Sequence, residues 1–556
     1  MPSSYPVPLR AVPVSAGMMI AVPLELAASP LRNGRNLGSA DRSALVIGGT
    51  DKIRTGGAVV FCKVVVVAEA QVRRDGQVRA KGSPVHHATL GPLEERLGSQ
   101  AGPGVIGGIA GRAPLGARFV KGERERLLAR AFMIRMIVLM TLMPDARPGD
   151  VIAALAGDLA LVPWARPWRP ASARAAGDWR SALGPVPLEE LRDLVLGSAW
   201  REHQDRGCPG AVTIGKRRPL RAGSLDGTLL RVPDTPANRA VFGTVGTGDD
   251  SGPYPCLRAL PLTCCSCRAL FAMPHGPAGT GKAAAEQGLL DEAMERLPVL
   301  FDPGWIWLMD RNYHGAPRLA RMMRSTHVLA RLKSDIPLKR TSPILPDCSY
   351  RAELSGDGVT ITVRVIEYFV DVEGQDVPEM FCLVTDLMDW EDHPAAELAA
   401  LYKWRWDGSE TALREAKAPL RGAGPGTGPM LRSGSPGLVR QELAAWTAGT
   451  GLARGIILDA ALGAASAGKG RRTGLTVRPR DLSFARAVRA VLSAIRLGHA
   501  CYQAVTSEIG NYRNVVDRNR HRARKSKSPS SFAHAGPADT VTRIAPAVIT
   551  MANTPA

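Results

Sequence analysis

The feature that most constrains the fold of this chain is a pair of short apolar segments in which an aspartate stands at the end of a predicted strand. The first segment, GSLDGTLLRVP, contains Asp226, and the second, GWIWLMD, ends on Asp310. Residues 283–297, between the two, have the apolar spacing of an amphipathic helix. Strands that alternate with helices in this way predict an α/β fold with a mixed sheet.

Changes of pattern divide the chain into regions, since 556 residues leave room for several domains. The predicted regions are 1–85, poorly ordered or over-extended; 90–215, a helical domain; 216–332, the first part of an α/β core; 333–393, a β insertion; 394–510, the rest of the core with a helical C-terminal region; and 511–556, a basic flexible tail.

The two ends of the chain leave alternatives open. Residues 1–85 are rich in Pro, Gly, Ser and Ala and have no consistent period. We expect a poorly ordered extension or translation from an upstream start codon there, and a small strand-bearing domain is the alternative. Near the other end, RNRHRARKSKSPSS is either a phosphate-binding arm or a solvated tail.

The charge balance points to a polyanionic partner. Lysine and arginine total 71 against 51 aspartates and glutamates, a formal net charge of +20 with neutral histidine. Cationic side chains that neutralise phosphates release counterions, so nucleic acid is the simplest partner. An anionic membrane surface, or a GC-rich genome that favours arginine, would also give this composition.

Several features favour a cytoplasmic, nucleoid-associated bacterial protein with no membrane segment. The most apolar stretch, residues 131–143, is short for a membrane span and carries Arg135. The first thirty residues lack the pattern of a secretory signal. Nine cysteines, an odd number scattered along the chain, do not form a disulfide framework and fit a reducing compartment.

A third segment, LYKWRWDGSETALREAKAPLRG, places Tyr402, Arg405, Glu410 and Lys417 on about four turns of predicted helix. A single aspartate or glutamate is usually a turn residue or a helix cap, so the prediction rests on all three acidic segments together. Carboxylates are the ligands that hard divalent cations prefer, and a pair of such ions promotes phosphoryl transfer. The neighbouring basic residues suggest that the phosphate belongs to DNA.

These motifs resemble those of the DDE transposases of bacterial insertion sequences, specifically the insertion-sequence-four family. The resemblance covers roughly residues 90–525. The matching residues are Asp226, Gly227, Thr228, Asn238, Phe242, Gly243, Asp310, Arg311, Asn312, Tyr313, Tyr402, Arg405, Glu410 and Lys417.

The resemblance implies a ribonuclease-H-like catalytic core with a β insertion, flanked by helical N- and C-terminal regions. It implies an endonuclease that binds terminal inverted repeats as a homodimer and catalyses strand cleavage and strand transfer, as in cut-and-paste DNA transposition. Two Mg²⁺ or Mn²⁺ ions would be held by Asp226, Asp310 and Glu410. The implied DNA contacts are Tyr402, Arg405, Lys417, Arg311 and Asn238.

One departure from the family pattern concerns the third motif. Four residues separate Arg405 from Glu410, one more than in the family. On an ideal helix, one extra residue turns Glu410 by about 100° relative to Arg405. A bulge at Gly408 would restore the geometry. Otherwise Asp407 competes as the ligand, with Glu415 a weaker choice, or the chain is a catalytically inactive descendant that only binds DNA.

Two further motifs receive less weight. The segment GPAGTGKA at 276–283 resembles a phosphate-binding loop, which would make the chain a P-loop ATPase acting on nucleic acid, but Ala283 replaces the hydroxyl residue that binds magnesium. The run Cys264-Cys265-Ser266-Cys267 lacks a second Cys or His pair at zinc-site spacing, so we expect buried strand cysteines there.

Overall fold

A computed structural model describes residues 44–55, 58–72, 78–80, 89–112, 130–143, 145–156, 172–245, 254–278, 282–371, 379–417, 431–466, 477–497, 501–511 and 548–552. The chain divides into two compact units. One unit contains residues 1–82 and 163–166, and the other contains residues 83–162 and 167–556.

The smaller unit contains a long antiparallel hairpin. Strand β1 (Ala44–Thr55) pairs with β2 (Ala58–Val72) along its whole length, and β3 (Val78–Ala80) pairs with β2. The valine-rich sequence of β2 has the β-branched side chains that favour an extended backbone. Residues 44–55, 58–72 and 78–80 thus form strands, the type of element that the strand-bearing alternative contains.

The larger unit begins with helices, in the region where the sequence predicts them. They are α1 (Pro92–Ala101), α2 (Val105–Arg112), α3 (Arg130–Leu142), α4 (Pro148–Ala156), α5 (Ala173–Leu183) and α6 (Val186–Arg206). These helices share one hydrophobic core with α12 (Pro436–Ser466), α13 (Phe484–Leu497) and α14 (Tyr502–Asn511). Helix α3 is buried on nearly all sides because almost every residue in it is apolar.

A large mixed sheet forms the rest of this unit, and among the described residues it has 11 strands. From one edge to the other the main path is β13 (Leu338–Arg340), β14 (Tyr350–Gly356), β15 (Val359–Asp371), β16 (Glu379–Thr385), β12 (His327–Arg331), β11 (Trp305–Met309), β5 (Leu220–Leu225), β8 (Leu262–Cys264) and β9 (Leu270–Ala272). Strands β5, β11 and β12 are parallel, and the other pairs are antiparallel. The fold is therefore mixed α/β, as predicted.

Helices connect the parallel strands. Helix α8 (Lys282–Arg296) and the 3₁₀ turn η6 (Pro298–Leu300) precede β11, and α9 (Ala316–Met322) lies between β11 and β12. The middle of β5 consists of the small residues Ala222, Gly223 and Ser224. A Cβ atom on Gly223 would lie 2.8 Å from the ring of Trp307, so this glycine makes room for that tryptophan of β11 in the core.

The predicted β insertion extends the same sheet instead of forming a separate one. Strand β16 pairs with β12, and β15, β14 and β13 follow it to the sheet edge. Strand β17 (Val548–Met551) pairs with β15. The prediction of a flexible tail over 511–556 is therefore wrong for these last strand residues, and residues 512–547 lie outside the described part of the chain.

The segment GSLDGTLLRVP forms two strands where the sequence predicted one. Asp226 and Gly227 separate β5 from β6 (Thr228–Arg231), and β6 belongs to a small sheet of order β10-β7-β6. The other members are β7 (Cys256–Ala259) and β10 (His275–Pro277), and α7 (Pro236–Phe242) follows β6.

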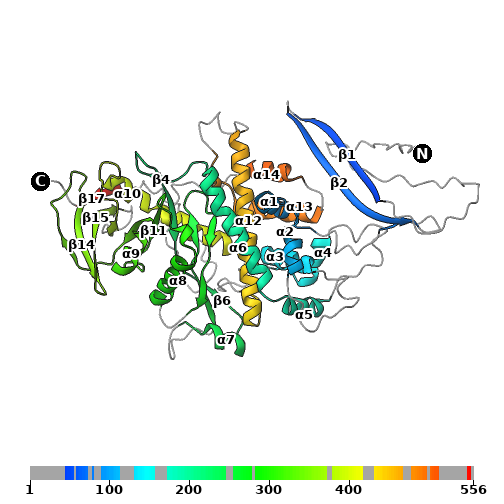
Figure 1. The fold of residues 1–556 in the computed structure, drawn as a ribbon, viewed down its shortest axis with the longest axis horizontal. Coiled ribbons are helices and arrows are strands. Elements are labelled where there is room, and N and C mark those ends of the chain that lie inside the picture. Colours follow the sequence, from blue (N-terminus) through cyan, green and yellow to red (C-terminus); the bar gives the residue numbers. More distant parts are fainter. Residues whose placement is uncertain are drawn as a thin grey trace, which may run out of the picture. The chain divides into compact units, whose positions relative to one another are not determined.

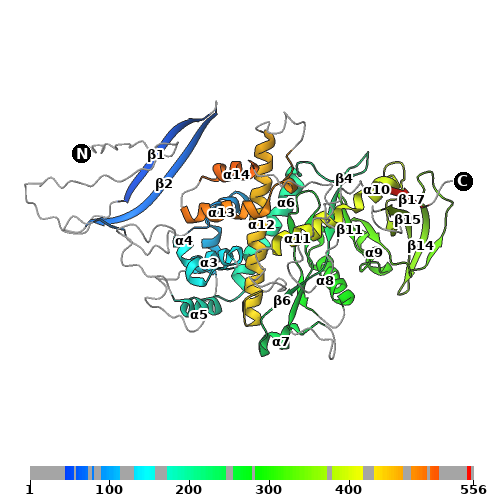
Figure 2. The same cartoon turned by 180° about the vertical axis from the view of Figure 1, so that it is seen from behind.

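Helices α6 and α12 lie between the helical part and the sheet (Figure 1). On the sheet side, α10 (Ala395–Tyr402) leads into a π-helical turn, η7 (Trp406–Thr411), and then α11 (Ala412–Lys417). Figure 2 shows α11 reaching towards α12, where the indole N–H of Trp446 donates to the Ala416 carbonyl at 2.9 Å. Among the described residues, no helix combines the length and apolar character that crossing a bilayer requires.

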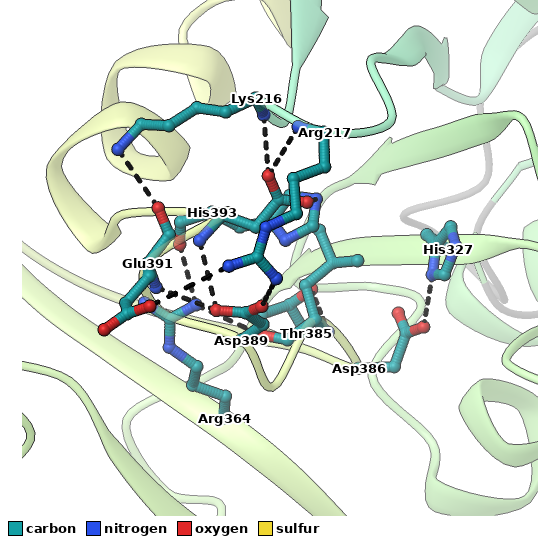
Figure 3. A network of polar contacts seen from close by, with 11 residues as sticks. Lys216, Arg217, His327, Arg364, Thr385, Asp386, Asp389, Glu391 and His393 are labelled. Carbon is teal, nitrogen blue, oxygen red and sulfur yellow. Dashed lines mark hydrogen bonds and ion pairs between the residues drawn. The ribbon is translucent and has the colours of Figure 1, made fainter.

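A buried polar network anchors the start of α10 (Figure 3). Arg364 of β15 is fully buried, donates to the carbonyls of Leu387 and His393 at 3.0 and 2.7 Å, and forms an ion pair with Asp347. Asp347 also accepts the backbone N–H of Ala395 at 2.8 Å. These bonds fix the first residue of α10 to the sheet, and α10 leads directly into the third predicted motif.

Candidate active site

Asp226 and Asp310 follow neighbouring parallel strands at the same edge of the sheet. Strands β5 and β11 pair from Trp305 opposite Arg221 to Leu308 opposite Ser224. Two further residues in the same register bring Asp310 opposite Asp226. Adjacent strands lie about 4.8 Å apart, so the two aspartates stand side by side. The predicted position of each aspartate at a strand end is confirmed.

The next parallel strand adds a basic residue that the sequence reasoning missed. Strand β12 pairs with β11 up to Met309 opposite Ala330, so one more step places Arg331 opposite Asp310. The Arg331 guanidinium lies 3.9 Å from the centroid of the Phe381 ring. Its position at the end of a third predicted strand was the available signal, but only the strand order shows which aspartate it neighbours.

The extra residue of the third motif is absorbed by the π-helical turn η7, which spans Trp406–Thr411. A π-helical turn takes one residue more than an α-helical turn. The bulge predicted around Gly408 is therefore confirmed, and it compensates for the rotation that an additional residue would cause. The Glu410 side chain within this turn is exposed.

Gly408 allows the turn η7 to pack closely against the sheet. A Cβ atom at Gly408 would lie 2.4 Å from the Ser224 hydroxyl and 2.8 Å from the Cys265 sulfur. The Thr263 hydroxyl donates to the Gly408 carbonyl at 2.8 Å. Only a residue without a side chain permits this approach. The turn that carries Glu410 thus rests on β5, the strand that leads to Asp226.

Both alternative carboxylates of this motif are held in ion pairs with buried arginines. Arg268 contacts Asp407 at 2.5 Å and Glu415 at 3.1 Å, and Arg454 also pairs with Glu415. Burial by itself would raise the pKa of Glu415, but the Arg454 and Arg268 guanidinium groups outweigh it and hold the pKa below its ordinary value. Asp407 and Glu415 therefore brace η7, and Glu410 is left as the exposed carboxylate of this motif.

Arg405 and Tyr402 lie against the strand ends. The Arg405 guanidinium is 3.5 Å from the Asp226 carboxylate, and its buried Nε has no hydrogen-bond partner among the described residues. The Tyr402 hydroxyl donates to the carbonyl of Met309 at 3.0 Å, and burial raises the pKa of Tyr402 to about 12. In this structure Tyr402 thus anchors the end of β11 next to Asp310, while its implied phosphate contact stays a prediction.

A buried carboxylate that was not predicted, Glu286 of α8, lies next to Gly227 and Asn312, which follow the two aspartates in the chain. It pairs with Arg258 at 2.7 Å, and it accepts the side-chain amide of Asn312 at 3.2 Å. A Cβ atom on Gly227 would lie 2.1 Å from its oxygen, which explains the glycine after Asp226.

Tyr313, which the sequence places in the Asp310 motif without a role, is a further part of this arrangement. Its hydroxyl is buried and has no hydrogen-bond partner among the described residues. Burial, together with the negative charges of Glu286, Asp310 and Asp226, raises the pKa of Tyr313 well above its ordinary value. The residue is therefore a neutral donor placed beside three carboxylates.

The remaining predicted DNA contacts differ in accessibility. Arg311 is exposed directly after Asp310, and Lys417 is partly exposed at the end of α11. Asn238 is fully buried, and its amide donates to the carbonyls of Pro233 and Ser433 at 3.0 and 3.2 Å. Asn238 therefore packs α7 in the interior and does not face a ligand in this structure.

The three predicted metal ligands do not converge fully. Within the described ranges, the group of three acidic, histidine or cysteine ligand atoms within 4.8 Å of one another is a different one, His203, Cys264 and Cys267. Asp226 and Asp310 are aligned by strand register, whereas Glu410 is presented from the neighbouring turn η7. For all three carboxylates to bind the same two metal ions, the Glu410 side chain or the turn η7 has to move.

The rival phosphate-binding loop finds little support. Gly276 and Pro277 of its motif lie inside β10, a three-residue strand that pairs antiparallel with β7 at the edge of the small sheet. A phosphate-binding loop instead follows a strand and wraps the phosphates with its glycines before the helix begins. Residues 279–281 of the motif lie outside the described residues.

Comparison with known proteins adds little. No protein-family model and no curated protein matches the sequence. Among solved structures, the chain is similar to piggyBac transposase in the cryo-EM structure of its synaptic complex with hairpin DNA, with a TM-score of 0.36 and 12% identity over 79% of this chain and 87% of that chain. A TM-score this low carries no argument about function, which has to follow from the residues of the site.

Proposed function

We propose that this chain is a DDE-type DNA transposase of a bacterial insertion sequence, with Asp226, Asp310 and Glu410 as its acidic triad. The observation that carries the proposal is the register of β5 and β11, which aligns the two aspartates at one sheet edge. In this part of the sheet, β9, β8 and β5 pair antiparallel, and β11 and β12 follow in parallel with β5. We assign them to the ribonuclease-H-like core that the motifs imply.

The donor set suits a hard divalent cation. Asp226 and Asp310 offer carboxylate oxygens side by side, and Glu410 is an exposed carboxylate on the adjacent turn. We assign Mg²⁺ or Mn²⁺, as two ions, to these residues. When bound, such ions activate the attacking oxygen of a phosphodiester exchange and stabilise the leaving one.

The protein residues around the triad have separable tasks. Arg405 lies against Asp226 and compensates its negative charge, and Tyr402 holds the end of β11. Arg311, Arg331 and Lys417 supply cationic groups near the strand ends that fit DNA phosphates. Tyr313 adds a buried, uncharged hydroxyl near these carboxylates.

We further assign terminal inverted repeats and target DNA as substrates, a homodimer as the form that bridges two DNA ends, and the bacterial cytoplasm and nucleoid as the location. Water attack on the element's end frees a 3′-hydroxyl, which then attacks a second phosphodiester. The net charge of +20 supports a DNA partner without identifying its sequence.

End cleavage tests the proposal. Full-length protein is incubated with duplex DNA that carries the flanking repeats of its own gene, with Mg²⁺ or Mn²⁺. We expect cleavage at the repeat boundary, and we expect Asp310→Asn to lower its rate at least about 100-fold, since a ligand of the reacting ions is worth several kcal/mol.

Asp335→Asn is the matched control, because Asp335 is an exposed aspartate beyond β12, and this variant should cleave normally. Cleavage that survives Asp310→Asn would show that the site is misassigned.

A second candidate, an inactive transposase descendant that only binds DNA, is favoured by one observation. The three carboxylates do not converge within 4.8 Å in the described residues. Tight binding of the repeats by wild-type protein, with no cutting under either metal, would select this candidate over the active enzyme.

A further inference from the structure

We propose that His203, Cys208, Cys264 and Cys267 form a structural zinc site, separate from the triad and independent of the proposed function. The four residues come from two places in the chain. His203 and Cys208 lie at the end of α6 and just after it, and Cys264 and Cys267 flank the turn between β8 and β9. The set offers three sulfurs and one imidazole nitrogen, the donors of Cys₃His zinc sites.

The ligand atoms are already gathered. Those of His203, Cys264 and Cys267 lie within 4.8 Å of one another, and all three residues are buried. The Cys208 thiol interacts with both Cys264 and Cys267, although it lies outside the group that meets the 4.8 Å limit. We assign Cys208 as the fourth ligand from its place just after α6; in this structure its thiol donates to the Pro209 carbonyl at 3.9 Å.

The imidazole of His203 has the orientation of a metal ligand. Its Nδ1 lies 2.7 Å from the Ala199 carbonyl, which can only accept, so Nδ1 carries the proton. In the neutral ring Nε2 then carries no proton, so its lone pair can bind a metal ion. This nitrogen lies 2.8 Å from the Cys267 sulfur. A backbone carbonyl that fixes the second ring nitrogen is the usual support of a zinc-binding histidine.

The turn that carries the cysteines is also built for a metal. The backbone N–H of Ser266 donates to the Cys264 sulfur at 3.3 Å, which favours a thiolate. Arg268, the residue after Cys267, has a φ of 61°, an uncommon conformation for a residue with a side chain. The backbone thus turns sharply so that Cys264 and Cys267 face the same point.

The cysteines are buried, as predicted, but Cys265 and Cys267 lie in the turn after β8 rather than on a strand, and His203 lies beside Cys264 and Cys267. The second pair is His203-x₄-Cys208, whose spacing resembles the short ligand pairs of zinc sites. It was missed because one member is a histidine and because the pair lies on a different element. An S₃N set without oxygen donors favours zinc over the hard cations proposed for the triad.

The site would also brace the third motif. Cys265, inside the turn, contacts Gly408, and Arg268 binds Asp407 and Glu415 on either side of Glu410. A zinc ion that fixes this turn therefore fixes the surface on which η7 rests. It would act as a positioning element and take no part in the reaction.

Metal content of the wild-type protein gives the first test. We expect full-length protein purified without chelator to contain about one zinc ion per chain by mass spectrometry of the metal. Cobalt(II) exchanged into the site should give the intense visible bands of tetrahedral coordination and a sulfur-to-cobalt charge-transfer band. Wild-type protein that contains no zinc and gives no such cobalt spectrum would overturn the proposal.

Variants identify the ligands. His203→Ala and the double variant Cys264→Ser, Cys267→Ser should each lower the zinc content to below about a tenth. His203→Cys should keep the metal and intensify the charge-transfer band, because a fourth sulfur replaces nitrogen. Cys265→Ser is the matched control in the same turn and should keep zinc. Zinc retained by the double variant would refute the assignment, whether or not the protein cleaves DNA.

Discussion

At the scale of single residues, Gly408 joins the strand that leads to Asp226 to the turn that carries Glu410. Its backbone lies so close to Ser224 and Cys265 that a Cβ atom would meet them at 2.4 and 2.8 Å. The same residue permits the π-helical turn that absorbs the extra residue of the third motif. One position thus sets both the local helix geometry and its distance from the sheet.

Gly408→Ala tests this role. The added methyl group should push η7 away from β5 and β8, which costs about 1–3 kcal/mol of unfolding free energy as overpacking. Urea denaturation measures the loss, and we expect end cleavage to fall as well because Glu410 moves with the turn.

Gly463→Ala in α12 is the control, since a Cβ atom there meets nothing within 4 Å and alanine favours a helix by up to about 1 kcal/mol. If Gly408→Ala were as stable as Gly463→Ala, the close packing of η7 would be refuted.

At the scale of elements, the segment from η7 to α11 is held by ion pairs in addition to its buried apolar residues Ala412, Leu413 and Ala416. Arg268 and Arg454 are nearly fully buried, with side-chain exposures of 6% and 2%, and Glu415 lies between them. Buried guanidinium groups without a carboxylate partner are strongly unfavourable. The position of α11, and with it that of Lys417, therefore depends on the charge of Glu415.

Glu415→Gln makes this dependence visible in the pH profile. The pKa of Glu415 in the folded protein is below its ordinary value of 4.5, so its contribution is complete above that pH and is lost as the pH falls through the lowered pKa. At neutral pH the variant should be about 3 kcal/mol less stable, because buried Arg454 loses its ion pair with Glu415 and buried Arg268 keeps only its ion pair with Asp407. The difference from wild type should shrink as the pH falls below 4.5.

Denaturation curves across this pH range provide the measurement. Glu353→Gln is the control, since its partner Lys339 is 79% exposed and such a pair contributes little. A wild-type advantage over Glu415→Gln that did not change with pH would contradict an ionic origin.

At the scale of the whole molecule, the net positive charge of the chain favours the DNA partner of the proposed function. The acidic site alone would repel DNA. The chain carries a net charge of +20, while the sheet edge itself presents Asp226, Asp310 and Glu410. Bound cations and the arginines around the edge must offset that local negative charge before a phosphate can approach. In the proposed function, long-range attraction and local catalysis would therefore be carried by different residues.

DNA binding should accordingly weaken steeply with salt. Each phosphate contact contributes about 0.9 to the slope of log affinity against log salt concentration, so Arg311→Ala and Lys417→Ala should each reduce the slope by about 1. Fluorescence anisotropy with repeat DNA over a range of salt concentrations measures it. Lys339→Ala, at the far edge of the sheet, should leave the slope unchanged. If Arg311→Ala and Lys417→Ala kept the wild-type slope, as Lys339→Ala should, then Arg311 and Lys417 would not contact DNA.

Much of the candidate site was predictable because it depends on short stretches of sequence. The strand ends at Asp226 and Asp310 follow from apolar runs that stop at an acidic residue, and the bulge follows from Gly408 in an otherwise helical pattern. The DNA contact at Asn238 came from the resemblance and not from the local pattern, and the fold buries that side chain. Local reasoning did not foresee the strand Val548–Met551, which pairs with β15.

What the sequence determined by itself is the type of each element and the chemistry available, since both depend on neighbouring residues, on charge and on side-chain type. What only the tertiary structure decided is which residues meet. The register of β5 and β11 aligns two aspartates, Glu286 and Tyr313 lie beside them, and the end of α6 reaches the cysteine turn. These contacts depend on how segments that are distant in the sequence pair and pack. No local sequence pattern determines which segments do so.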